Sequence, residues 1–223
     1  MLASPALALV PDTDPGPPLT VEVTTNYAES NPNYAGGLIY HVAGFLHNPT
    51  DAFYAVTAVN VTFYDASGFR GAYYPFPMRR YGEYIWHGAL QAEVGCSMVG
   101  PGESCPFSVE IGAQDMASFL VHPDAEIAEW HVSASVTVGD VKVSDTGTSY
   151  VKISGTVANP NPYPVKNVSI AGVLLDAAGQ MVSTGKGVVP AIAAEGSASF
   201  EVYIAREAYA SYALYPTAEQ DAK

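Results

Sequence analysis

The strongest constraint on this chain is an internal repeat. Residues 40–68 and 151–179 align without a gap at a separation of 111 residues. The matched pairs are Gly44 and Gly155, Asn48 and Asn159, Pro49 and Pro160, Asp65 and Asp176, and Gly68 and Gly179. Because a self-similar period marks the unit of folding, the chain should consist of two copies of one structural unit.

The similarity continues downstream at a separation of 93 residues. The pairs there are Phe107 and Phe200, Val109 and Val202, Ser118 and Ser211, and Pro123 and Pro216. The shorter separation means that the first copy carries about 18 extra residues between Gly68 and Phe107. Upstream, Val21-Glu-Val aligns with Val132-Ser-Ala at the first separation, which predicts that the two units begin near residues 19 and 130.

Within each copy, apolar residues recur at every second position, as in Val59, Val61 and Phe63. Alternation of this kind, rich in β-branched and aromatic residues, is typical of half-buried strands. We therefore expect strands near residues 19–27, 38–47 and 55–64. The Asn-Pro segments between strands are turn-forming, and each Asp-Ala-x-Gly should close a tight turn in which glycine supplies a positive φ.

The run Val61-Thr-Phe-Tyr-Asp65, followed by Ala-Ser-Gly, resembles the hallmark of FxLYD domains. Two further motifs fit that family, V-x-G-x-x-x-N and Pro-Gly…Phe-x-Val; their residues are Val42, Gly44, Asn48, Pro101, Gly102, Phe107 and Val109. Two departures occur: Val61 stands where the family has Phe, and the second copy reads Gly172-Val-Leu-Leu-Asp176. The resemblance implies immunoglobulin-like β-sandwiches of prokaryotic secreted or surface proteins, and no common activity.

These observations predict an all-β protein of two tandem immunoglobulin-like β-sandwich domains, the first with an inserted aromatic-rich hairpin. The expected organisation is an extended segment 1–18, domains 19–127 and 128–218, and a tail 219–223. A length of 223 residues with 48% hydrophobic content is enough for two cores. The net charge of −13 argues against binding to nucleic acid or anionic membrane, since phosphates require clustered Lys and Arg.

Two interpretations remain open for residues 1–18. Ala6-Leu-Ala8 resembles the A-x-A end of a secretory signal. Alternatively, the apolar segment that includes Leu7, Leu9 and Val10 can add as a strand to the sheet edge of another subunit. The apolar run is too short to span a membrane, and the prolines after it are typical of an extended linker.

Cys96 and Cys105 flank a turn-forming sequence that contains Pro and Gly. In a chain of extracellular character, such a pair is most simply a disulfide that closes a hairpin. The alternatives are two free thiols or a metal site, and the spacing matches no zinc template.

No catalytic motif appears in the sequence, and we expect a protein without enzymatic activity or cofactor. His41 and His47 lie six residues apart in one strand and share a face, so a metal pair is geometrically feasible. Lys152 and Ala158 occupy the matching places in the second copy, and the sequence shows no third ligand. A structural or solvent-facing role for these histidines is favoured, with no metal bound.

The segment that only the first copy contains is rich in aromatic and arginine side chains, which interfaces and sugar-binding sites concentrate. Its candidate binding residues are Tyr73, Tyr74, Arg79, Arg80, Tyr81, Tyr84 and Trp86. The alternative is a hairpin that buries these rings against its own sheet. Two sequons begin at Asn60 and Asn167, both in expected strands, and are weak candidates for glycosylation.

Together these features favour a non-catalytic secreted or cell-surface protein with a structural or adhesive role. It can serve as the self-assembling subunit of an extracellular filament, with copies of itself or other surface proteins as partners. The competing hypothesis is a carbohydrate- or ligand-binding module that uses the aromatic and arginine segment, with a glycan as partner.

Overall fold

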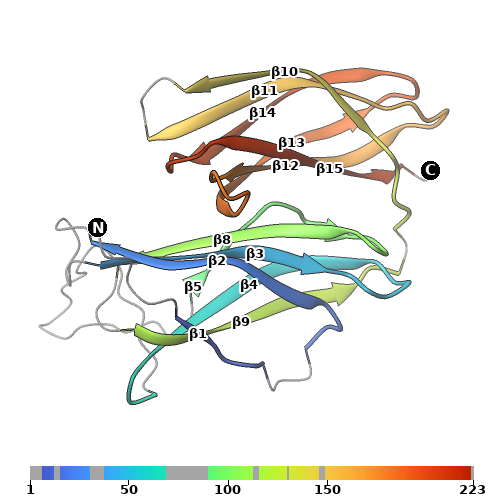
Figure 1. Ribbon diagram of the computed structural model, residues 1–223. Coiled ribbons are helices and arrows are strands. Elements are labelled where there is room, and N and C mark those ends of the chain that lie inside the picture. The colour runs from blue at the N-terminus through green and yellow to red at the C-terminus, as the bar shows by residue number, and fades with distance from the viewer. Residues whose placement is uncertain are drawn as a thin grey trace, which may run out of the picture.

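The computed structural model describes residues 7–12, 16–30, 38–68, 90–112, 116–129, 131–145 and 149–221. These residues form fifteen strands and no helix, so the all-β prediction is confirmed. None of them belongs to a helix long and apolar enough to cross a membrane. Figure 1 shows the strands arranged as four stacked layers of sheet.

The N-terminal half, residues 7–127, contains two sheets. In the first sheet the strand order is β1-β9-β4-β5, and β7 also pairs with β4. Its strands are β1 (Ala8–Leu9), β9 (Met116–Ile127), β4 (Tyr54–Asp65), β5 (Leu90–Gln91) and β7 (Met98–Val99). The other has the order β2-β3-β8-β6: β2 (Thr20–Ser30), β3 (Leu38–His47), β8 (Ser104–Gly112) and β6 (Glu93–Val94). The expected strands near 19–27, 38–47 and 55–64 therefore exist.

The core of this half forms between the two sheets because each contributes alternate side chains to it. Val61 and Phe63 of β4 and Phe119 of β9 meet Leu46 of β3 and Phe107 of β8, all fully buried. Period-two alternation in the sequence thus corresponds to one buried and one outward face per strand.

The C-terminal half, residues 131–221, also contains two sheets. The first is β10 (Thr137–Asp145), β11 (Tyr150–Ala158) and β14 (Ser197–Ala205). The second is β13 (Met181–Ile192), β12 (Val165–Leu175) and β15 (Ser211–Gln220). Their shared core is likewise built from alternate residues, among them Ile153, Ile170, Leu174, Phe200 and Ile204.

Strand pairing repeats between the halves. Gly44 pairs with Phe107, and Gly155 pairs with Phe200. The same equivalence holds for the other sheet of each half, where Pro123 lies opposite Val59 and Pro216 lies opposite Ile170. Residues that are 111 or 93 positions apart in the sequence therefore occupy equivalent places in the two halves.

The expected alignment of Val21-Glu-Val with Val132-Ser-Ala is wrong. Val21 pairs with Leu46, and the residue that pairs with the equivalent Val157 is Val138, not Val132. Residues 131–136 instead run beside β15, where Ala134 N–H donates to the carbonyl of Ala218. The chain needs these residues to cross from one half to the other before β10 begins.

The expected tail 219–223 also begins too early. Strand β15 continues to Gln220, and Glu219 pairs with Lys166 while remaining only 5% exposed. Its carboxylate lies 2.7 Å from His131 Nδ1, a contact that anchors the end of the strand.

The two Asp-Ala-x-Gly turns form as predicted. The Asp65 and Asp176 carboxylates accept backbone hydrogen bonds from residues two positions later. Gly68 and Gly179 adopt positive φ angles of 78° and 80° and donate to the carbonyls of those aspartates. These aspartates therefore act as turn residues.

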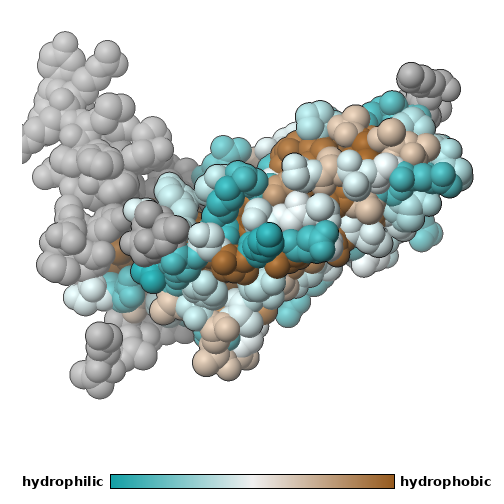
Figure 2. Space-filling view, turned by 90° about the horizontal axis from the view of Figure 1, so that it is seen from above, coloured by the Kyte–Doolittle hydropathy of each residue, from teal (hydrophilic) through white to brown (hydrophobic). Residues whose placement is uncertain are grey.

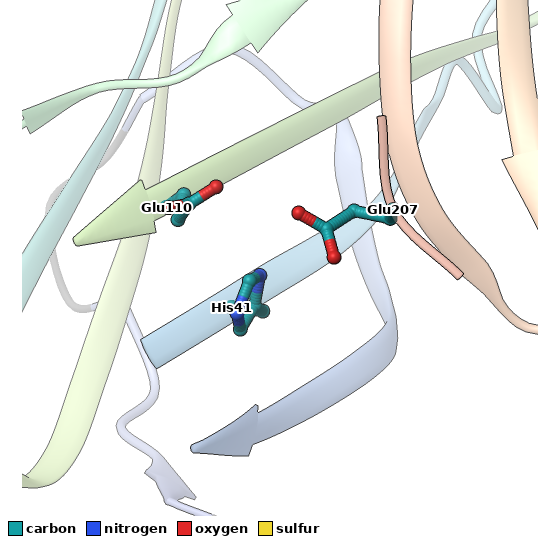
Figure 3. A group of neighbouring side chains, drawn as sticks. All are labelled: His41, Glu110 and Glu207. Atoms are coloured by element: carbon teal, nitrogen blue, oxygen red, sulfur yellow. The ribbon is translucent and has the colours of Figure 1, made fainter. Parts of the chain in front are cut away.

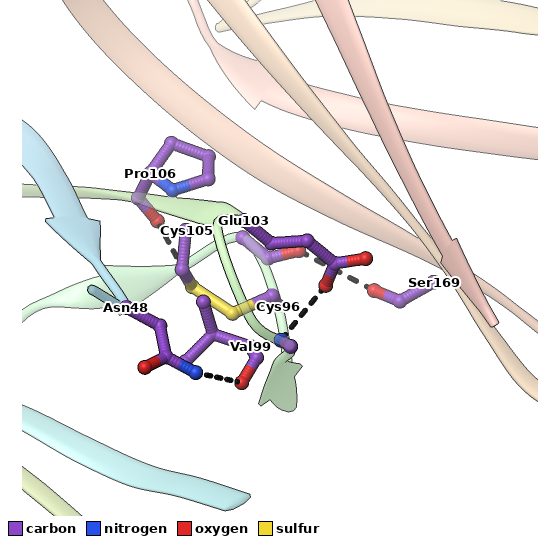
Figure 4. The surroundings of a disulfide bond; sticks show 9 residues. Asn48, Cys96, Val99, Glu103, Cys105, Pro106 and Ser169 are labelled. Carbon is purple, nitrogen blue, oxygen red and sulfur yellow. Dashed lines mark hydrogen bonds between the residues drawn. A yellow bond between two sulfur atoms is a disulfide. The ribbon is translucent and has the colours of Figure 1, made fainter. Parts of the chain in front are cut away.

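Cys96 and Cys105 form the predicted disulfide, and both are buried in the core of the N-terminal half (Figure 4). The expected hairpin is confirmed, because β6 and β8 flank the two cysteines and pair antiparallel, with Val94 opposite Phe107 and Gly95 N–H donating to the carbonyl of Pro106. Within the connection between them, β7 pairs with β4 of the opposite sheet. The disulfide therefore closes this hairpin next to Asn48 and Val99, where Asn48 Nδ2 donates to the carbonyl of Val99 (3.1 Å).

The two halves pack through the sheet of β2, β3 and β8 and the sheet of β13, β12 and β15, which are the middle layers of Figure 1. Ala43, Val173 and Met181 are buried between them, and the rings of Phe45 and Tyr215 meet edge to face at 5.7 Å. Polar contacts across the junction include Thr184 N to Ser108 Oγ (3.2 Å), Ser169 Oγ to the carbonyl of Gly95 (3.3 Å), and Thr25 Oγ1 to the carbonyl of Met181. This packing holds the halves at a fixed relative position.

Candidate functional site

A group of ionisable side chains converges at one end of the junction between the halves. The ligand-type atoms of His41, Glu110 and Glu207 all lie within 4.8 Å of one another. Within the described part of the chain, this is the one such cluster of histidine and acidic residues. Figure 3 shows the carboxylate of Glu207 directed toward the other two side chains.

Strand register places two members of this cluster side by side. His41 on β3 lies directly opposite Glu110 on β8 and opposite Tyr27 on β2, so the three side chains form one row across the sheet. The row lies on the outward face of the sheet because the neighbouring residues of β3, Tyr40 and Val42, point into the core.

The third member comes from the other half of the chain. Glu207 belongs to the loop between β14 and β15. Backbone hydrogen bonds hold both ends of this loop: Arg206 N–H donates to the carbonyl of Ser149, and Ala210 N–H donates to that of Leu175. The docked halves therefore bring Glu207 to a sheet from which 97 residues of sequence separate it (Glu110 to Glu207).

His41 is buried without a hydrogen bond to Nε2. Its side chain is 5% exposed and stacks on the ring of Tyr27 at 4.6 Å. Glu29 Oε1 lies 3.5 Å from Nε2, within ion-pair range, but the geometry gives no hydrogen bond. Burial lowers the pKa of His41, and the nearby charges of Glu110 and Glu29 only partly oppose it. The imidazole is consequently neutral at physiological pH.

The pKa values of two other ionisable residues near His41 are also shifted. Burial, together with the charges of Glu110 and Glu29, raises the pKa of Glu207 to about 7. Burial and the charge of Glu207 are the two largest causes that raise the pKa of Tyr27 to about 12. The cluster is thus partly desolvated and negatively charged, an environment that favours a cation or a proton.

The substitution Glu207→Gln should make the metal-free protein more stable at pH 8 but not at pH 4.5. Because the folded-state pKa of Glu207 is about 7 and the ordinary value is 4.5, the folded chain binds this proton more tightly. The unfolding free energy of the wild type should therefore fall as pH rises from 4.5 to 7, and glutamine removes that loss. We expect a gain of about 1–2 kcal/mol at pH 8, less than the full shift would give because the side chain is partly solvated.

Urea denaturation in the presence of a chelator at both pH values measures this difference. Glu126→Gln, at an exposed position of β9, is the matched control and should change little at either pH. Equal stability of the wild type and Glu207→Gln at pH 8 would contradict the expected desolvation of this carboxylate.

His41 and His47 share one face of β3 as expected, but they contact different partners. His47 Nδ1 lies 2.7 Å from Ser104 Oγ, and its Nε2 lies 2.7 Å from Glu22 Oε2. Both of its ring nitrogens are therefore hydrogen-bonded within the N-terminal half. The additional ligands near His41 are Glu110 and Glu207, which sequence spacing could not reveal.

The segment proposed for strand exchange lies against its own chain. β1 pairs in parallel with Ser118 and Phe119 of β9, and Val10 N–H donates to the carbonyl of Phe119. Leu7 is buried in the core, whereas Leu9 is 48% exposed.

The two sequons differ in their surroundings. Asn60 Nδ2 donates to Asp124 Oδ2 at 2.6 Å, so this amide is already engaged. Asn167 is exposed at a positive φ of 49°, where the register of β12 against β15 is irregular. The proposed binding residues of the aromatic and arginine segment lie outside the described residues: Tyr73, Tyr74, Arg79, Arg80, Tyr81, Tyr84 and Trp86.

The sequence matches no protein-family model, and a search of curated proteins found no match. The function of the chain is accordingly inferred from its own structure and chemistry.

Proposed function

We propose that this chain is a non-catalytic secreted or cell-surface structural protein of two tandem immunoglobulin-like domains of the FxLYD type, and that it assembles with copies of itself. The equivalent strand pairing in the two halves supports the tandem organisation. The buried Cys96–Cys105 disulfide supports an oxidising, extracellular location. Only 14% of residues are charged, and Figure 2 shows large pale and brown areas among the hydrophilic residues of one face.

The observation that carries the self-assembly proposal is a difference between two equivalent sheet edges. In the N-terminal half, β1 covers the edge of β9 at Ser118 and Phe119. The equivalent residues of β15, at the separation of 93, are Ser211 and Tyr212. There β15 forms the end of its sheet, and within the described residues no strand covers this part of it. An open edge of this kind accepts an added strand.

We propose the N-terminal segment of a second copy as the occupant of that edge. The segment already has the backbone conformation for pairing with an equivalent strand, since β1 does so on β9. Pro216 follows the open part of β15 and lacks an N–H, which restricts strand addition to the residues before it. A segment that leaves β9 of its own chain for the β15 edge of the next copy links the two copies head to tail, and repetition of this contact produces a polymer.

Deleting residues 1–18 should abolish polymers. Negative-stain electron microscopy and light scattering on the purified chain, with and without these residues, measure the effect. A truncated chain retains the acceptor edge but lacks the donor, so a small amount of it mixed with full-length chain should shorten the polymers. The double substitution Ser211→Lys and Tyr212→Lys, at two exposed edge positions, should also block assembly.

A matched control adds the same two charges away from β15, as Ser197→Lys and Ser199→Lys at exposed positions of β14. This control should leave polymers intact. Undiminished assembly of the truncated chain, or monomers from both the full-length and the truncated chain, would contradict the proposal.

A further inference from the structure

The cluster around His41 has a set of donors that suits a transition-metal ion. It combines one imidazole nitrogen with carboxylate oxygens from Glu110 and Glu207. Imidazole together with carboxylate is typical of Zn²⁺ and similar first-row ions, whereas Ca²⁺ and Mg²⁺ prefer oxygen ligands alone.

A second observation, independent of the acidic residues, points to a ligand. Buried polar side-chain atoms almost always have a hydrogen-bond partner. His41 Nε2 is the one such atom without a hydrogen bond among the described residues, although Glu29 Oε1 lies 3.5 Å from it. The buried imidazole is also neutral, the form in which histidine binds a metal.

The positive charges near the cluster are directed elsewhere. Arg206 is adjacent to Glu207 in sequence, but its Nε lies 2.9 Å from Asp145 Oδ1. Of the lysines in the same half, Lys152 pairs with Glu201 and Lys166 with Asp221.

The equivalent place in the C-terminal half shows that this cluster is not a general property of the repeat. There Lys152 replaces His41, and Tyr203 replaces Glu110 as its cross-strand partner. The Lys152 ammonium lies 5.6 Å from the centre of the Tyr203 ring and bonds to Glu201. The position that holds a neutral imidazole among carboxylates in one half therefore holds a cation in the other.

We propose that His41, Glu110 and Glu207 bind one divalent transition-metal ion of the Zn²⁺ type, which ties the C-terminal half to the N-terminal half. His41 and Glu110 belong to the N-terminal half, and Glu207 belongs to the C-terminal half. Bound metal thus cross-links two halves that otherwise meet through packing and a few hydrogen bonds. This inference goes beyond the proposed structural function and does not depend on self-assembly.

The test uses full-length protein without a polyhistidine tag, stripped with a chelator and dialysed. Calorimetric titration with Zn²⁺ should show one equivalent bound per chain. At a free Zn²⁺ concentration 100 times the Kd, Tm should rise by about 5–10 °C. Glu207→Gln and Glu110→Gln should each weaken binding at least tenfold, and His41→Gln should do the same. Mg²⁺ and Ca²⁺ should not compete at equal concentration.

The matched controls are His47→Gln and Glu22→Gln, a histidine and a glutamate from the same two strands as His41 and Glu29. They should bind Zn²⁺ as the wild type does. If His41→Gln fails to fold, Glu207→Gln still decides the matter, because its chelator-treated form should be at least as stable as the wild type. Absence of stoichiometric binding, unchanged affinity in Glu207→Gln, or equal loss in His47→Gln would overturn the proposal.

Discussion

Alanine in place of Gly44 should destabilise the N-terminal half by about 3 kcal/mol or more. The pairing of β2 with β3 is irregular between Val23 and Thr25, which presses the β2 backbone against Gly44. A Cβ atom at this position would lie 2.0 Å from the carbonyl oxygen of Glu22 and 3.0 Å from Val23 Cα. These atoms belong to the backbone of β2, which cannot move away without breaking the ladder, so the two strands must separate locally.

Gly139→Ala is the matched control, because Gly139 also lies in an irregularly paired strand but has room for a side chain. The nearest atom to its added Cβ would be Thr156 Oγ1, at an ordinary contact distance of 3.6 Å. We expect a change of about 1 kcal/mol or less, with either sign. Urea denaturation followed by circular dichroism compares the two variants, and equal effects would show that the close approach at Gly44 is not what requires glycine.

Aspartate in place of Asn159 should be the second severe change, with a loss of about 3 kcal/mol at pH 7. Asn159 is 1% exposed, and its Nδ2 donates to the carbonyls of Tyr163 (2.8 Å) and Ala193 (3.0 Å). Its Oδ1 accepts from the backbone N–H (3.0 Å) and the Nδ2 (2.7 Å) of Asn161. A carboxylate would keep these two contacts but direct a negative charge at two carbonyl oxygens.

Acidification to about pH 4 should recover part of this loss, because a buried carboxyl group in this position has a raised pKa and, once protonated, donates one hydrogen bond. Asn167→Asp is the control, since Asn167 is exposed in the same half and its positive φ suits aspartate as well as asparagine. Denaturation midpoints at pH 4 and 7 measure both variants. A loss that is the same at both pH values would rule out the electrostatic explanation.

Asn48 repeats this arrangement in the N-terminal half, and Asn48→Asp should have a similar effect there. Its Nδ2 donates to the carbonyls of Ala52 (2.6 Å) and Val99 (3.1 Å), and its Oδ1 accepts from Thr50 N–H. The repeated glycines and asparagines therefore have a structural explanation: they occupy places where backbones touch or where a buried corner needs two donors and an acceptor.

Much of the fold could be predicted from these local patterns. Alternation of apolar residues identified the central strands, because one face of each strand is buried in its own half. Asp-Ala-x-Gly identified turns through the conformational freedom of glycine, and two cysteines separated by a short turn identified their own disulfide. Each of these predictions depends on interactions between residues close in sequence or on a period of two.

The alignment of Val21 with Val132 was wrong for a reason that follows from the same principle. A match over three residues, Val21-Glu-Val with Val132-Ser-Ala, is too short to distinguish a strand from a connecting segment. Only strand register shows that Val138 is the equivalent of Val21. The hairpin at the disulfide could be predicted because its turn residues and cysteines are close in sequence, whereas the pairing of β7 with β4 in the opposite sheet could not.

The sequence by itself determined that the chain is a repeat of β-strands with a disulfide, since periodicity and turn chemistry are properties of neighbouring residues. Only the tertiary structure decided how the halves dock and, with that, where Glu207 lies. Consecutive apolar residues from Ile170 to Leu175 indicate a strand covered on both faces, but they do not say by what. The cluster of His41, Glu110 and Glu207 exists because docking of the two halves brings a loop of one half onto a sheet of the other, and contacts between such distant residues follow from shape and packing rather than from any local pattern.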